Sequence, residues 1–286
     1  MLGHPRAAVR ERVRRCVFCG SPNLTNEHMF PRWTHRYMQP REPGKALSYR
    51  GTEYPDRSEF VVLKLPGASR DWQIKCVCGG SRHACNTGWM KDIEDKAKKI
   101  MKHIIIGNEL RLSPKDQEII ATWAVLKSMI SEFDFKNKGI THHMQRKRMM
   151  LRSLPPEQGW GVWIGNYERN ELKIEWASRP MLLLSNDQAI RRAGAKARYF
   201  NSNCTTQIIG KMFIQVLHGP IPHLIKWWRF ALPDRGTLFR IWPPTQFSLV
   251  WPGRAMTDRD AEVAVNAFAK FAANSHRKHS GRSAVT

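Results

Sequence analysis

Two cysteine pairs, far apart in the chain, constrain the N-terminal fold more strongly than any other feature of the sequence. Cys16 and Cys19 are separated by two residues, a spacing that offers two thiolates to one tetrahedral zinc ion. Cys78 and Cys85 are the favoured second pair, with Cys76 held in reserve for the place of Cys78. We expect one structural zinc ion to bind both pairs and to hold these segments together.

The net charge indicates a polyanionic partner. Lys and Arg number 47 against 24 Asp and Glu, which gives a formal net charge of +23. The phosphates of nucleic acid attract such a surface, and an anionic membrane surface would attract it as well. Charge alone does not choose between them, and the motifs described below favour double-stranded DNA.

The sequence carries no signal for a membrane or for export. It contains no apolar run of about 18 residues, and its Arg-rich beginning lacks the apolar segment of a secretory signal. We therefore expect a soluble, cytoplasmic protein without a membrane partner. In a reducing compartment, metal binding is a more typical role for the six cysteines than disulfide formation.

Residue spacing predicts three helices in the first half of the chain. Apolar residues at three- and four-residue steps predict a helix from Trp89 to near Gly107. A second helix is predicted to begin at Ser113, which precedes a proline, and to run to Phe133 as a core element. A third covers 141–154 and ends at a proline pair, where we place a domain boundary.

Beyond the proline pair, the pattern changes to short strand-like runs, and a terminal helix begins at Thr257. The predicted fold class is therefore α+β, with an N-terminal zinc-bound domain, a helical connector and a C-terminal α+β domain that contains an antiparallel sheet. The predicted boundaries are 1–106 for the first domain, 107–156 for the connector, 157–275 for the C-terminal domain of unknown role, and 276–286 for a disordered basic tail.

Glu27 and His28 stand side by side after the first cysteine pair, and Asn86 directly follows the second. A carboxylate suits a hard cation, and a neutral imidazole suits proton abstraction near pH 7. Adjacent residues of a strand point to opposite faces, so both can serve one site only where the backbone is irregular. A Glu-His dipeptide alone is more often a surface pair, and the interpretation depends on the neighbouring motifs.

The order of these motifs resembles the HNH endonuclease family in its zinc-containing ββα-metal, treble-clef form. The resemblance covers about residues 12–100 and rests on Cys16-x2-Cys19, on Glu27-His28, and on Cys85-Asn86 with a helix after it. The acid is Glu where Asp is commoner, and the segment after His28 is long. The middle Asn of the family name has no clear counterpart, although Asp71 or Gln73 stands near its place.

The resemblance implies a bacterial or phage enzyme that hydrolyses DNA phosphodiester bonds with one Mg²⁺ or Mn²⁺ ion. By motif position, His28 is the general base, and Glu27 and Asn86 hold the divalent ion. The expected products are a 5′-phosphate and a 3′-hydroxyl. Three basic residues are predicted to contact DNA phosphates: Arg32, Arg36 and Lys91. His83, within the second cysteine segment, stays open as a rival metal ligand.

Two other functions share this fold and charge. A non-catalytic, zinc-stabilised DNA-binding protein is the main alternative, and it differs from the enzyme at His28. A ribonuclease would have the same active site and would differ only in the groove that binds the nucleic acid. A homodimer is compatible with the sequence, which does not determine the oligomeric state or the target.

Overall fold

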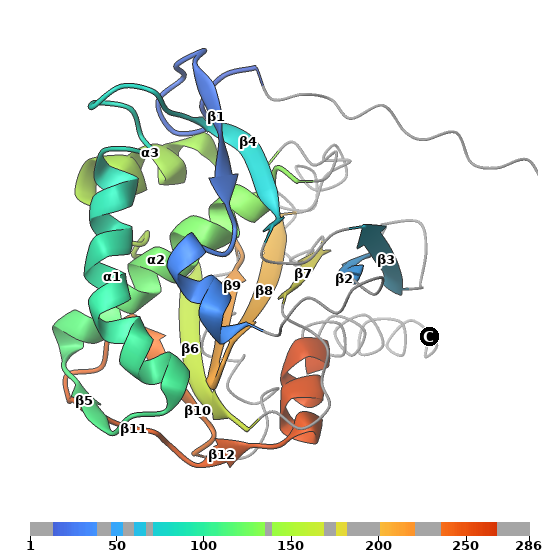
Figure 1. Ribbon diagram of the computed structural model, residues 1–286, viewed down its shortest axis with the longest axis vertical. Coiled ribbons are helices and arrows are strands. Elements are labelled where there is room, and N and C mark those ends of the chain that lie inside the picture. The colour runs from blue at the N-terminus through green and yellow to red at the C-terminus, as the bar shows by residue number, and fades with distance from the viewer. Residues whose placement is uncertain are drawn as a thin grey trace, which may run out of the picture.

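A largely antiparallel sheet with helices packed against it forms the body of the protein in the computed structural model (Figure 1). The structure describes residues 14–38, 47–53, 60–66, 71–134, 139–168, 176–181, 201–220 and 236–267. Within these residues, helices and antiparallel sheets occur together, which confirms the predicted α+β class. None of the helices in the described part of the chain has the length and hydrophobicity needed to span a bilayer.

The central sheet has the strand order β10-β6-β9-β8-β7, and all four of these pairings are antiparallel. Its strands are β6 (Trp160–Tyr167), β7 (Trp176–Met181), β8 (Ser202–Ile209), β9 (Met212–His218) and β10 (Leu238–Trp242). The short β12 (Ala255–Met256) adds to β6 in parallel.

The strands β8 and β9 form a hairpin that turns at Gly210, whose φ is +53°. A Cβ atom at this position would lie 2.5 Å from the carbonyl oxygen of Ile105, at the end of the first helix. Glycine is therefore required both by the backbone conformation and by the close approach of the two segments. The amide of Lys211 donates a hydrogen bond to the same carbonyl, with an N–O distance of 2.8 Å.

In the sequence, three helices follow the N-terminal segments and precede the strands of the central sheet. They are α1 (Trp89–Ile106), α2 (Pro114–Ser131) and α3 (His143–Arg152). The first ends at Gly107 in the left-handed conformation, and the second begins with a capping box between Ser113 and Asp116, as the sequence predicted. The third is shorter than predicted, because Thr141 donates hydrogen bonds to the carboxylate of Glu132 instead of joining the helix.

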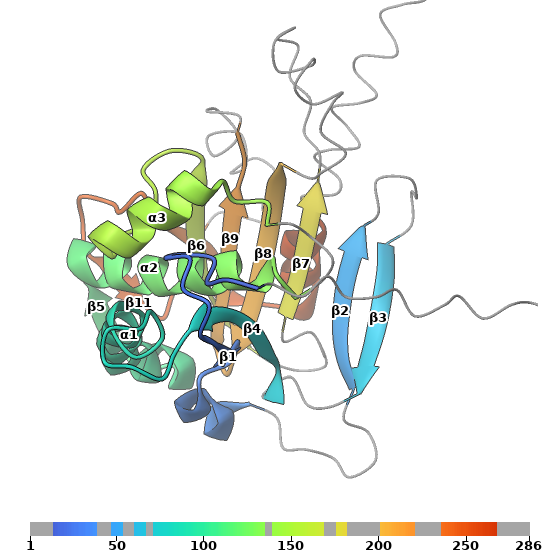
Figure 2. The same ribbon diagram turned by 90° about the horizontal axis from the view of Figure 1, so that it is seen from above.

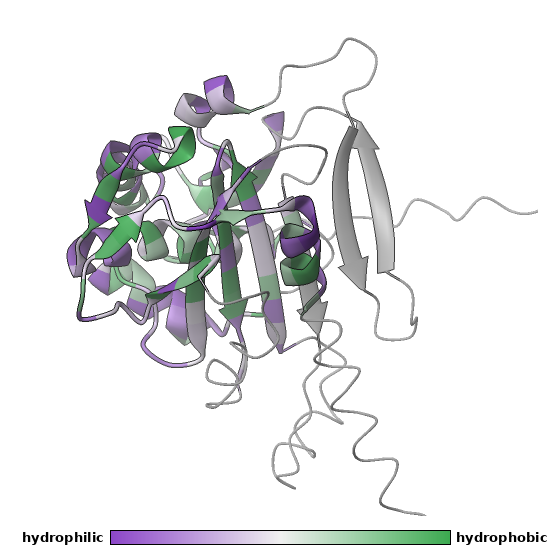
Figure 3. Cartoon of the chain, turned by 90° about the horizontal axis from the view of Figure 1, so that it is seen from below, coloured by the Kyte–Doolittle hydropathy of each residue, from purple (hydrophilic) through white to green (hydrophobic). Residues whose placement is uncertain are grey.

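Helices cover both faces of the central sheet. In Figure 2, the face of the sheet that α1 and α2 cover is turned toward the viewer. A helix that includes residues 258–267 lies behind the sheet. Neighbouring residues of β8 alternate between these layers: Ile208 packs in a cluster with Ala261 and Ala264, whereas Ile209 belongs to the core that contains α1 and α2. Figure 3 shows hydrophobic residues concentrated along the strands between the two layers.

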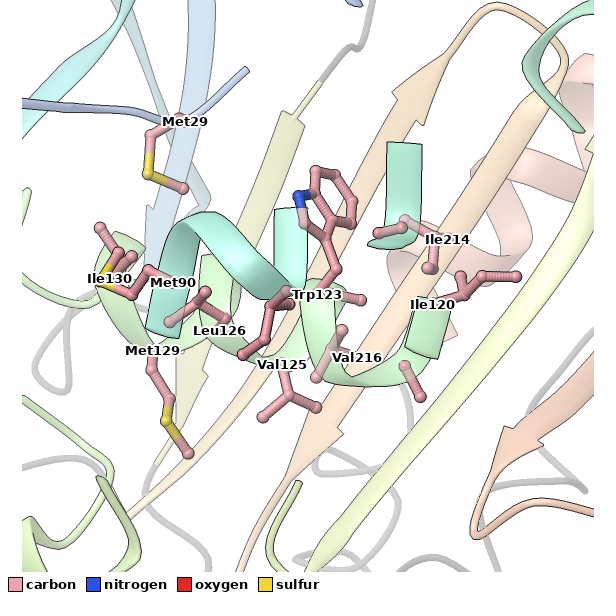
Figure 4. Packing of buried hydrophobic residues seen from close by; sticks show 14 of the residues in the cluster. Met29, Met90, Ile120, Trp123, Val125, Leu126, Met129, Ile130, Ile214 and Val216 are labelled. Carbon is pink, nitrogen blue, oxygen red and sulfur yellow. The ribbon is translucent and has the colours of Figure 1, made fainter. Parts of the chain in front are cut away.

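The helix α2 is the centre of the larger core. Every residue from Ile120 to Ser131 is buried. Figure 4 shows its side chains between Met29, Met90 of α1 and the β9 residue Val216. Such burial on all sides predicts that α2 positions whatever polar groups it carries with little freedom of movement.

Smaller strand pairs surround this core. β1 (Leu24–His28) pairs with β4 (Gln73–Cys78), β2 (Leu47–Glu53) with β3 (Phe60–Pro66), and β5 (Leu110–Leu112) with β11 (Leu249–Trp251), all antiparallel. A short 3-10 helix, η1 (Arg32–Tyr37), follows β1. The domain boundaries given above stay predictions, and the tail 276–286 lies outside the described residues.

Candidate metal centre and adjoining pocket

Four cysteines meet at one point beside the β1–β4 pair. The sulfurs of Cys16 and Cys85 are 3.7 Å apart, those of Cys19 and Cys78 are 3.5 Å apart, and all four lie within 4.8 Å of one another. Zn–S bonds of about 2.3 Å in a tetrahedron place sulfurs roughly 3.8 Å apart. The four thiols thus have the number, chemistry and spacing that fit a metal ion such as zinc, and the favoured set of cysteines is confirmed as a cluster.

Two backbone turns present these sulfurs. In the first turn, the amide of Gly20 donates to the carbonyl of Cys16 at 2.9 Å. In the second, the amide of Cys85 donates to the sulfur of Cys78 at 3.1 Å, an arrangement that stabilises a thiolate. The hydrogen bond with Cys85 lowers the pKa of Cys16.

Cys76 and His83, the two alternatives for the cluster, both lie outside it. Cys76 is fully buried in β4, and this burial raises the pKa of its thiol well above the ordinary value. His83 is exposed in the loop between Cys78 and Cys85. The protonated Cys76 thiol therefore belongs to the apolar core.

The turn after Cys85 connects the cluster to α1. The amide of Asn86 donates to the carbonyl of Cys78 at 3.0 Å, which fixes this residue beside the cluster. A Cβ atom at Gly88 would lie 2.9 Å from the carbonyl oxygen of Ala84, so the turn into α1 requires glycine. The sequence Asn86-Thr87-Gly88 therefore holds Asn86 at the start of the helix.

Glu27 is buried and points toward α2. Its Oε1 atom lies 2.5 Å from the Nζ atom of Lys127, whose side chain is 1% exposed. The same ammonium donates to the carbonyl oxygen of His28 at 2.8 Å. One lysine thus bridges the side chain of Glu27 and the backbone of its neighbour.

Glu27 and Asn86 line one pocket of about 280 Å³, together with Glu94, Lys91 and Lys127. Carboxylate and amide oxygens are ligands that hard cations prefer, and this pocket offers those of Glu27, Glu94 and Asn86, with the ammonium of Lys127 already paired to Glu27. Burial raises the pKa of Glu94, although the positive charge of Lys127 acts in the opposite direction. The distance from the Nζ atom of Lys127 to Oε2 of Glu94 is 3.8 Å.

His28 adjoins this pocket through the backbone, but its side chain is not part of the lining. A register irregularity in β1 lies between Thr25 and Asn26, one residue before Glu27. The pKa of His28 is lowered by burial and further by the charges of Arg32 and His35. Its imidazole is therefore neutral near pH 7, which is the state that a general base needs.

Gln73, opposite His28 in the β1–β4 register, contacts the imidazole. The Nε2 atom of His28 lies 3.2 Å from the side-chain amide of Gln73. The side-chain nitrogen of Gln73 faces the ring and donates to the Nε2 atom of His28, so the proton of the neutral imidazole lies on Nδ1. Within the described part of the chain, Nδ1 is buried and has no hydrogen-bond partner.

The three basic residues predicted to contact phosphates are all exposed. The guanidinium of Arg36 lies 4.8 Å from the ring centre of Tyr37, and Arg32 is near enough to His28 to lower its pKa. Lys91 reaches the pocket and forms an ion pair with Asp95 at 2.5 Å. Their role toward DNA stays a prediction.

Lys127 was missed by the sequence interpretation, which treated its helix only as core. One signal could have found it, because Lys127 is the single charged residue in the run from Ile120 to Ser131. A lysine is almost never fully buried unless it is paired. A charge in so apolar a run therefore predicts a buried acidic partner.

Comparison with protein families, with curated proteins and with solved structures gave no match for this chain. What can be said of its class therefore comes from the site itself. The site consists of a four-cysteine cluster that fits a metal ion and a pocket lined by charged residues next to a neutral histidine.

Proposed function

We propose that the protein is a metal-dependent HNH-type endonuclease that hydrolyses DNA phosphodiester bonds. The observation that carries the proposal is the meeting of Glu27 and Asn86 on one pocket, beside the four-cysteine cluster and next to His28. These residues come from segments far apart in the sequence, and the family motif requires them together. The proposed setting is the cytoplasm of a bacterium, or of a host cell for a phage-encoded protein.

Each residue has a physical role in the proposed reaction. His28 accepts a proton from the water molecule that attacks phosphorus, because its imidazole is neutral at the working pH. Glu27 and Asn86 would hold a Mg²⁺ or Mn²⁺ ion, which supplies charge stabilisation to the phosphoryl oxygens and the leaving 3′ oxygen when it is bound. Gln73 orients the imidazole through Nε2. The zinc ion at the four cysteines has a structural role only.

The charge of the molecule supports a DNA substrate. The chain has a formal net charge of +23, and five exposed lysines lie on α1, the helix that begins beside Asn86. They are Lys91, Lys96, Lys98, Lys99 and Lys102. Lysines on an exposed helix can neutralise successive phosphates, so we expect binding that weakens steeply with added salt.

The proposal is tested by incubating purified, zinc-loaded protein with supercoiled plasmid and Mg²⁺ or Mn²⁺. We expect nicked or linear DNA with 5′-phosphate and 3′-hydroxyl ends, and no cleavage in the presence of a chelator that removes the divalent ion. Absence of cleavage over a broad panel of DNA substrates and metals would exclude the enzyme.

A non-catalytic DNA-binding protein is the second candidate. The ion pair between Lys127 and Glu27 favours it, because the ammonium already neutralises the carboxylate proposed to bind the catalytic ion. This candidate predicts binding to duplex DNA that depends on salt but leaves the plasmid intact. It also predicts that His28→Ala binds as the wild type does.

A further inference from the structure

The ammonium of Lys127 lies where a cation would meet Glu27. Its Nζ atom is 2.5 Å from Oε1 of Glu27 and 2.8 Å from the carbonyl oxygen of His28. The side chain is 1% exposed, so water does not screen its charge. The ammonium and a divalent ion thus compete for the same carboxylate.

The charged side chains around the pocket cancel to within one unit of charge when the carboxylates of Glu27 and Glu94 are ionised. Lys127 faces two carboxylates, Glu27 at 2.5 Å and Glu94 at 3.8 Å. The other lysine on the pocket, Lys91, is occupied by Asp95. A divalent ion added to this group turns a small negative charge into a positive one beside the buried ammonium of Lys127, which disfavours binding of the ion. A phosphodiester carries one negative charge and would restore the balance.

We propose that Lys127 makes binding of the divalent ion depend on DNA. Without DNA, the ammonium holds Glu27 and weakens the site for the ion. The phosphodiester supplies the missing negative charge, so ion and DNA bind together. This inference rests on the proposed function, because it takes Glu27 and Asn86 as the ion's ligands. In this role Lys127 is a positioning residue that controls the order of assembly.

A purely structural ion pair would behave differently. It would support folding, but the affinity of the pocket for a divalent ion would be the same with and without DNA. Coupling between two ligands is reciprocal, so the proposal also requires that the divalent ion tighten DNA binding by the same factor. The two interpretations therefore separate in a binding experiment that involves no catalysis.

The test measures Mn²⁺ binding to zinc-loaded protein by the spin-resonance signal of free Mn²⁺, with and without a DNA duplex. All proteins carry His28→Ala, so that the duplex stays intact. We expect the His28→Ala protein to bind Mn²⁺ about tenfold more tightly with DNA than without it, a coupling of ordinary size. With Lys127→Met added, we expect tight binding already in the absence of DNA. Lys115→Met is the matched control, because Lys115 lies on the same helix as Lys127 but is exposed and outside the pocket, so we expect its removal to leave the Mn²⁺ affinity unchanged.

Equal Mn²⁺ affinity with and without DNA in the His28→Ala protein would overturn the inference, whatever the variants do. An unchanged affinity in a folded Lys127→Met protein would also overturn it. Lys127→Gln serves as a second variant if the methionine protein fails to fold. If the wild type proves unable to cut DNA while these affinities change as expected, the endonuclease proposal fails and the role of Lys127 stands.

Discussion

Lys127 and Glu27 form a buried ion pair across 100 positions of the sequence, with the Nζ and Oε1 atoms 2.5 Å apart. The pair joins α2, which is buried throughout from Ile120 to Ser131, to the strand that carries His28. Because α2 is buried on all sides, the position of Lys127 is set by the core. The core therefore determines where the carboxylate of the proposed site lies.

The first prediction concerns the stability of this pair. Lys127→Met leaves a buried carboxylate without its cation and should lower the free energy of unfolding by about 3–5 kcal/mol. Glu27→Gln should also destabilise, but the double variant should lose less than the sum of both, because neither charge is left alone. Urea unfolding of the four proteins measures this. Strictly additive losses would show that the two residues do not interact.

The second prediction concerns the four-cysteine cluster. Metal analysis should find about one zinc ion per chain, and Cys85→Ser should lose the ion and unfold the region around it, because structural zinc contributes folding free energy directly. Cys76→Ala is the matched control, since Cys76 is buried in the same strand as Cys78 but lies outside the cluster. Loss of zinc from the Cys76 variant would mean that the ligand set is different.

The third prediction concerns acid stability. Burial lowers the pKa of His218 from 6.5 to about 4, and its ring stacks on Trp160 with centroids 4.3 Å apart. The unfolded chain therefore takes up a proton below pH 6.5 that the folded protein does not accept until about pH 4, so stability falls as the pH falls through this window. His218 alone should cost about 2 kcal/mol between pH 7.5 and pH 5.

His218→Phe keeps an aromatic ring beside Trp160 and removes the titratable group. The free energy of unfolding of this variant should fall less steeply between pH 7.5 and pH 5 than that of the wild type. Urea unfolding at both pH values gives the difference. Parallel pH profiles for the two proteins would contradict the prediction.

The fourth prediction concerns the beginning of α2. Ser113 accepts a hydrogen bond from the amide of Asp116, and the carboxylate of Asp116 accepts one from the amide of Ser113. Ser113→Ala removes one half of this capping box and should cost about 1 kcal/mol. Thermal unfolding followed by circular dichroism provides the measurement, and Ser113→Thr, which retains a hydroxyl, should restore most of the loss.

The helices and the cysteine ligands could be predicted because their signals are local. Ser113 and Gly107 carry the physical properties that begin and end helices, and these properties act within a few residues. Cys16 and Cys19 are separated by only two residues, the spacing that offers two thiolates to one metal ion. The sequence was therefore sufficient to predict the start of α2 and the set of clustered cysteines.

The partner of Glu27 could not be predicted in this way. Its contact with Lys127 depends on how α2 packs against β1, and nothing local to either residue specifies that packing. The contact therefore depends on the tertiary structure.

The central claim is that His28 activates water for phosphodiester hydrolysis. The most direct test compares the rates of plasmid cleavage by the wild type, His28→Ala and His143→Ala with Mn²⁺ present. His143 is exposed on α3 and serves as the control for loss of a histidine. We expect His28→Ala to be slower by about 100-fold or more, and His143→Ala to cut as the wild type does. Cleavage by a folded His28→Ala protein at the wild-type rate would contradict the account.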